Sequence, residues 1–203
     1  MDNLNFSRFF VNTKAEGSDV YDFRDNTMLL IVDIQPKLMN TMEKGEEGTV
    51  RAEALAKAFR TYGMHVLATE QYPKGLGRLD DRLLEYVEND HVFDKTLFDA
   101  CINPVNDYIA KNGISNVVVV GAEAHVCVYQ TVRSLRNAGL NVFLVEDAVN
   151  SGTDKLKKTA IRAMRDMGTV IVNTEMVLFD LAHDAKDEHF KMIQNMVKEL
   201  RAR

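Results

Sequence analysis

The chain has 203 residues, of which 46% are hydrophobic, with a formal net charge of -5 and two cysteines. These values suit one layered domain, and we expect an N-terminal arm over residues 1–24 and a single domain over residues 25–203. The negative charge and the lack of a dense Lys/Arg run argue against nucleic-acid binding. The sequence has no run of 18 apolar residues, which is what would predict a membrane span. The N-terminus lacks the Arg-rich, acid-poor character of a transit peptide, so we expect a cytoplasmic protein.

Short apolar runs alternate with segments of helical spacing, which is typical of a parallel sheet built from βαβ units. The predicted strands are Met28–Ile34, Met64–Thr69, His91–Phe93, Val117–Val120, Val142–Val145 and Thr169–Val172. The predicted helices are Val50–Tyr62, Leu79–Val87, Pro104–Lys111, Cys127–Ala138, Leu156–Met167 and Asp187–Arg203. Glycines at 63, 113, 139 and 168 stand where helix C-caps belong. Right-handed crossovers then predict a three-layer α/β/α fold with six strands in the order 3-2-1-4-5-6.

This order makes the first and fourth strands neighbours at the switch point, where ligands bind in such sheets. Asp33 follows the first strand, and the loop Gly121–Cys127 follows the fourth. Cys127 at the first turn of a helix would have a lowered thiol pKa and would be a candidate nucleophile. The alternatives are a small core cysteine at Cys127 and a helix-capping carboxylate at Asp33.

Lys95 follows the short third strand in Phe93-Asp94-Lys95-Thr96-Leu97-Phe98. A single lysine in a loop is usually a solvated surface charge. The second strand is expected to lie between Lys95 and Asp33, so the loop that carries Lys95 would have to reach over it.

Three segments, Leu30–Gln35, Phe93–Phe98 and Gly121–Val128, together resemble the signature segments of the isochorismatase-like cysteine hydrolases. The resemblance implies a six-stranded parallel sheet covered by helices on both faces and a catalytic triad of Asp33, Lys95 and Cys127. It also implies a cis peptide at Ala122–Glu123 and an oxyanion hole formed by the N–H groups of Glu123 and Cys127. The residues expected to contact the substrate are Gln35, Gln71, Phe98 and His125.

Within this family the chain looks closest to isochorismatase-domain proteins of unassigned substrate. Nicotinamidases have an Asp-x-His metal motif after the second strand, where this chain has Glu70-Gln71-Tyr72, so the resemblance implies no metal and no other cofactor. Isochorismatase itself has no cysteine at the nucleophile position. Asp99 stands where many relatives have Ser. We therefore expect a hydrolase that acts on a small amide-type substrate through a thioester, and relatives of this kind imply a homo-oligomer.

Three alternatives remain open at this stage. A weakly active or inactive family member would act by ligand binding or assembly. A thiol redox protein would use Cys127 while Asp33 and Lys95 were incidental. A nuclease would need phosphate-binding or metal-binding groups, which the sequence pattern does not reveal.

Overall fold

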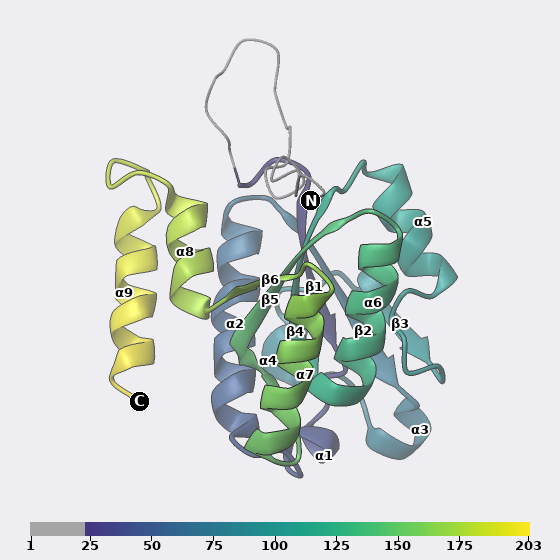
Figure 1. Ribbon diagram of the computed structural model, residues 1–203. Coiled ribbons are helices and arrows are strands. Elements are labelled where there is room, and N and C mark those ends of the chain that lie inside the picture. Colours follow the sequence, from purple (N-terminus) through teal and green to yellow (C-terminus); the bar gives the residue numbers. More distant parts are fainter. Residues whose placement is uncertain (1–22) are drawn as a thin grey trace, which may run out of the picture.

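The computed structural model describes residues 23–203, so the predicted N-terminal arm lies outside it except for Phe23 and Arg24. Figure 1 shows the central sheet between two layers of helices. All strand pairs are parallel and the order is β3-β2-β1-β4-β5-β6, which confirms the predicted order. The strands are β1 (Thr27–Val32), β2 (His65–Gln71), β3 (Val92–Lys95), β4 (Asn116–Ala122), β5 (Asn141–Asn150) and β6 (Val170–Val172).

The helices divide between the two faces of the sheet according to the core that they cover. One core joins the sheet to α1 (Pro36–Met39), α2 (Gly45–Thr61), α4 (Asp81–Leu84), α8 (Thr174–Ala182) and α9 (Phe190–Arg201). The other core joins it to α5 (Asn103–Lys111), the π-helical turn η3 (Ala124–Val128), α6 (Tyr129–Asn137) and α7 (Asp154–Asp166). Two short elements complete the described chain, α3 (Pro73–Leu76) and the 3-10 turn η2 (Asn89–His91).

Strand β1 explains why the sheet is central. Its Leu29 and Ile31 belong to one core, and Met28, Leu30 and Val32 belong to the other. Because both faces are buried, the strand needs no polar alternation. Its side chains point alternately into the two cores, so every residue of β1 is buried.

Most elements differ from their predicted bounds by a few residues, and four differ in kind or extent. The predicted helix Leu79–Val87 is only the single turn α4, which Asp80 caps through its bond to the Arg82 N–H. Helix α8 was not predicted, although Asn173 caps it by accepting from the Met176 N–H. Strand β5 continues to Asn150 past a register shift in its pairing with β4. The helix expected to start at Cys127 begins as η3, and α6 follows from Tyr129.

The four predicted C-cap glycines are confirmed, since all have the positive φ that favours glycine. The two described residues of the arm pack on the body: the Phe23 ring lies 5.2 Å from that of Phe143 in an edge-on contact. Arg24 forms an ion pair with Asp187. Within residues 23–203, no helix combines the length and apolar character that crossing a bilayer requires.

Gly121 brings the ends of β1 and β4 into close contact. It pairs with Val32 and has a φ of +129°. A Cβ atom at this position would lie 2.0 Å from the carbonyl oxygen of Val32. Only glycine fits there without displacing β1, and the residue after Val32 is Asp33.

Candidate active site

Asp33 lies where the chain leaves β1, in a left-handed conformation with φ of +53°. Its backbone N–H donates to the carbonyl of Thr69 on β2 at 3.2 Å, and its side chain is fully buried. The Thr69 hydroxyl donates to Oδ1 at 2.8 Å, and the Lys95 ammonium donates to Oδ2 at 2.6 Å. Each carboxylate oxygen thus has a donor, as burial of a charge requires.

Lys95 is the last residue of β3, and its side chain spans β2 to reach Asp33. The expectation that its loop would reach over is wrong, because the long lysine stem, and not the backbone, bridges the gap. The Nζ atom also donates to Oε1 of Gln71 at 2.7 Å. It lies 3.2 Å from the carbonyl oxygens of both Leu97 and Phe98. Lys95 is therefore a fully engaged buried cation and not a solvated surface charge.

Cys127 lies in η3 and is 5% exposed. Its thiol lies close enough to the Asp33 carboxylate and to the backbone of Glu123 for both to change its pKa. Burial raises the pKa of the thiol to about 12; the charge of Asp33 adds to the rise and Lys95 opposes it. The expected lowering of this pKa by the helix N-terminus is wrong, because desolvation of the thiolate dominates.

The protonation of Asp33 follows the same physics. Burial raises the pKa of its carboxyl above the ordinary value, whereas Lys95, Thr69 and Cys127 act to lower it. A carboxylate whose pKa lies above its usual range is a better proton acceptor. The pair of a protonated thiol and an adjacent basic carboxylate is the arrangement that general-base activation of a nucleophile needs.

The loop before Cys127 contains a cis peptide bond between Ala122 and Glu123. The carbonyl oxygen of Glu123 accepts the N–H groups of Val126 and Val128 at 3.0 and 3.2 Å. These bonds close the π-helical turn that carries the thiol. The Glu123 backbone lowers the pKa of the Cys127 thiol, so it lies near the atom that would attack a carbonyl.

Two expected substrate contacts, Gln35 and Gln71, have protein partners in the structure. The Gln35 amide donates to the carbonyls of Gln71 and Gly77 at 3.1 and 2.6 Å and accepts the Gln71 N–H at 2.8 Å. Gln71 accepts from Lys95 and donates to the carbonyl of Thr96 at 3.0 Å. Both side chains are held by these bonds, which fix the loops after β2 and β3.

The other two expected contacts lie toward the surface. Phe98 is 52% exposed, in the same loop as Leu97, which is 65% exposed. Tyr72, whose N–H donates to the Lys95 carbonyl at 2.8 Å, is 54% exposed. His125 is half-buried, and its Nδ1 lies 3.1 Å from the hydroxyl of Ser151. The buried cluster of Asp33, Lys95 and Cys127 thus has a loop edge with three exposed large side chains.

Sequence reasoning missed two buried threonines that support the cluster. Thr69 bonds Asp33, as described above. Thr131, on α6, accepts the Ala100 N–H at 2.9 Å and donates to the Cys127 carbonyl at 2.7 Å. The position of Thr69 at the end of the second predicted strand, beside the first, was the one available signal.

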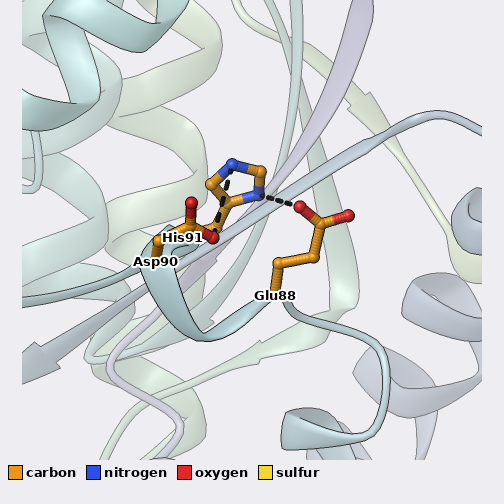
Figure 2. Close-up of side chains that lie close together, drawn as sticks. All are labelled: Glu88, Asp90 and His91. Atoms are coloured by element: carbon orange, nitrogen blue, oxygen red, sulfur yellow. Dashed lines mark ion pairs between the residues drawn. The ribbon is translucent and has the colours of Figure 1, made fainter.

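Figure 2 shows the one group of three His, Cys, Asp or Glu side chains in residues 23–203 whose atoms lie close enough to share a metal ion. Nδ1 of His91 lies 3.6 Å from Glu88, and its Nε2 lies 3.9 Å from Asp90. Glu88 is also paired with Arg60 at 3.0 Å. The group precedes β3, at the strand end opposite Lys95. We interpret it as an ion-pair cluster on the surface.

Comparison with known proteins agrees with the fold. The family model described as the isochorismatase domain matches residues 27–176. Isochorismatase family protein 1A of Dictyostelium discoideum is 34% identical and aligns with 87% of this chain and 88% of its own length. Isochorismatase domain-containing protein 2 of Danio rerio is 32% identical over 84% of this chain and 86% of its own. A solved structure named MAR1 ribonuclease from Caenorhabditis elegans superposes with a TM-score of 0.82 at 35% identity, over 86% and 91% of the two chains. The chain belongs to the isochorismatase family.

Proposed function

We propose that this protein is a cysteine-dependent hydrolase of a small amide-type substrate. Cys127 is the nucleophile, Asp33 is the general base and Lys95 holds the carboxylate. The observation that carries the proposal is that three side chains from three separate segments are all buried and close together: Lys95 pairs with Asp33, and the charges of both act on the pKa of the Cys127 thiol. Membership of the isochorismatase family supports a hydrolase in the broad sense.

The mechanism starts from the protonated thiol. Asp33 accepts the thiol proton as the sulfur attacks the substrate carbonyl, and Lys95 remains charged and balances the cluster. The N–H groups of Glu123 and Cys127 stabilise the oxyanion, a device in which one donor is typically worth about 2.7–4 kcal/mol. Asp33 then returns the proton to the departing amine as the carbon–nitrogen bond breaks. Finally, Asp33 takes a proton from water, the resulting hydroxide attacks the thioester, and Cys127 leaves with the proton.

The substrate class, the partners and the location are predictions. The substrate is a small molecule that enters at the loop edge with Tyr72, Leu97 and Phe98. Gln35, Gln71 and His125 support that edge, and Phe98 is the expected direct contact. No metal or other cofactor takes part in the mechanism above. A homo-oligomer, in which a second copy covers the exposed side chains, and a cytoplasmic location remain the expectations.

The test is a panel of amides, carbamoyl compounds and esters assayed with the wild type, Cys127→Ala and Cys101→Ala. Hydrolysis should depend on Cys127 and persist in Cys101→Ala, which is the matched control because the chain has two cysteines. A rate that survives in Cys127→Ala contradicts the nucleophile assignment. A stable oxidised sulfur at Cys127 without any hydrolysis favours the redox alternative, and binding without Cys127-dependent turnover favours an inactive family member.

A ribonuclease is a second candidate, supported by relatives at 30% identity or more that are named MAR1 or putative MAR1 ribonuclease. Helix α7 adds a physical observation: Lys155, Lys158, Arg162 and Arg165 are exposed and recur at helical spacing along one stripe. A groove of about 480 Å³ runs along this stripe. These cations do not form a dense run in the sequence, because helical spacing separates them, so the pattern did not reveal a phosphate-binding group. Cleavage of single-stranded RNA that is lost in Cys127→Ala and weakened in the double variant Arg162→Glu/Arg165→Glu supports this candidate; intact RNA in the wild type excludes it.

A further inference from the structure

A cleft of about 450 Å³ lies between α5 and α6, apart from the triad. Its volume is in the range of small-molecule sites, which are mostly apolar with a few placed polar groups. The cleft is lined by Asp99, Cys101, Asn106, Ile109, Ala110, Ser134, Leu135, Ala138 and Leu140.

The lining has an apolar part and a polar end. Ile109 and Leu135 are buried members of the core below, and Leu140 packs against the same core. Ala110 and Ala138 are exposed small residues of the two helices, so they leave the cleft open to solvent. The polar end consists of the Asp99 carboxylate and its neighbours. Such a surface suits a compact apolar group with one polar substituent.

Asp99 determines which polar substituent fits. Its Oδ1 accepts the Cys101 N–H at 2.8 Å, and its Oδ2 accepts the Ser134 hydroxyl at 2.5 Å. Both donors are neutral, and in residues 23–203 no Lys, Arg or His forms an ion pair with this half-buried carboxylate. The negative charge is felt nearby, since after burial it is the next cause that raises the pKa of the Cys101 thiol. A half-buried carboxylate without a cation favours a cationic ligand.

We propose that the cleft between α5 and α6 binds a small molecule with a compact apolar body and a protonated amine, which pairs with Asp99. The site is separate from the triad, and the proposal holds whether or not Cys127 turns over a substrate. It also explains why this chain has Asp at position 99: the carboxylate binds away from the triad, toward Ser134 and the cleft.

The cleft nevertheless borders the loop whose carbonyl groups accept hydrogen bonds from Lys95. The residue before Asp99, Phe98, offers its carbonyl to the Lys95 ammonium. The residue after it, Ala100, donates to Thr131, which binds the Cys127 carbonyl. A ligand on Asp99 therefore contacts the segment that holds both the lysine and the cysteine of the candidate active site.

Phenethylamine is the probe, and 2-phenylethanol is its neutral control of the same size. Binding is measured by calorimetry with the full chain, and the site is identified by the rate at which a small thiol reagent modifies Cys101, read by peptide mass spectrometry. The amine should bind about tenfold more tightly than the alcohol, because a charge-assisted hydrogen bond is stronger than a neutral one. It should also slow the modification of Cys101.

Three variants and one control locate the site. Ala138→Phe should fill the cleft and abolish binding of both probes, whereas Ala202→Phe, also at an exposed helix C-cap, should leave binding unchanged. Asp99→Asn should remove the preference for the amine. Melting curves check that each variant is folded, and Ala110→Leu offers a second way to fill the cleft. The proposal is overturned if neither probe binds, if binding persists in both cleft-filling variants, or if the amine preference survives in Asp99→Asn.

Discussion

The ammonium nitrogen of Lys95 lies 2.6 Å from Oδ2 of Asp33, although β2 separates the two strands that carry these residues. Both side chains are fully buried, and Thr69 of the intervening strand donates to the other carboxylate oxygen. Taking two charges out of water is costly, so this pair is sustained by its geometry and its additional hydrogen bonds. The pair sets the charge state of the whole cluster around Cys127.

Lys95→Met should destabilise the protein by about 3–5 kcal/mol at neutral pH, because the Asp33 carboxylate is left buried without its cation. Loss of Lys95 also removes a cause that lowers the pKa of Asp33, so this pKa rises further. A carboxyl whose folded-state pKa lies above its unfolded value destabilises the fold at higher pH. The deficit relative to wild type should therefore shrink as the pH falls from the higher pKa of the variant to the raised pKa of the wild type, and should stay constant below it.

Urea unfolding at several pH values measures this deficit. Lys158→Met is the control, since Lys158 pairs with Asp154 on the exposed surface and its loss should change stability little. Equal urea midpoints for wild type and Lys95→Met at pH 7 contradict the prediction.

Asp33→Asn should have opposite effects on turnover and on thiol reactivity. Hydrolysis should be lost with the general base. The pKa of Cys127 should fall, because the variant removes a negative charge that raises it and leaves the positive charge of Lys95. The rate of Cys127 alkylation by iodoacetamide, followed against pH by mass spectrometry, should then rise at lower pH than in wild type.

Cys101 provides the internal control for this measurement, since its profile should not move. An unchanged Cys127 profile in Asp33→Asn would mean that the carboxylate does not act on the thiol.

Thr131→Val should destabilise the protein by about 1–3 kcal/mol, because the buried Ala100 N–H loses its acceptor and the Cys127 carbonyl loses its donor. Thr131→Ser retains the hydroxyl, so it should keep most of the stability that these two hydrogen bonds provide. Hydrogen exchange at Ala100 reports the contact directly and should speed up in the valine variant alone. The control is Thr61→Val, at a half-buried hydroxyl that donates to the Lys57 carbonyl near the surface; an equal loss of stability in both would show that Thr131 has no special role.

The sequence predicts the meeting of Asp33 and Cys127, because strand order alone brings the ends of β1 and β4 together. Strand order does not predict the contact of Lys95 with Asp33, since this depends on a side chain that spans another strand; only the family resemblance implied it. The sequence also could not predict that the pKa of Cys127 is raised. A helix start is visible in the pattern, whereas burial of the thiol depends on packing of η3 against α7. Helix α8 was missed because six of its nine residues are apolar and they show no clear amphipathic period.

Gly121→Ala should be among the most damaging single changes in the sheet, at about 3 kcal/mol or more. The new Cβ would lie 2.0 Å from the Val32 carbonyl oxygen, a contact with backbone that no rotamer relieves. Two other glycines separate the causes. Gly63 has a φ of +68° with open space around it, so Gly63→Ala carries only the conformational cost of about 1–2 kcal/mol. Gly152 has neither a positive φ nor a close neighbour, so Gly152→Ala should be nearly neutral. The urea midpoint should be lowest for Gly121→Ala, higher for Gly63→Ala and close to wild type for Gly152→Ala. Equal midpoints for Gly121→Ala and Gly63→Ala would show that β1 can shift without loss of stability. If β1 holds its place only when position 121 is glycine, the same variant should also separate Asp33 from Cys127, and Cys127 alkylation should then lose its dependence on Asp33.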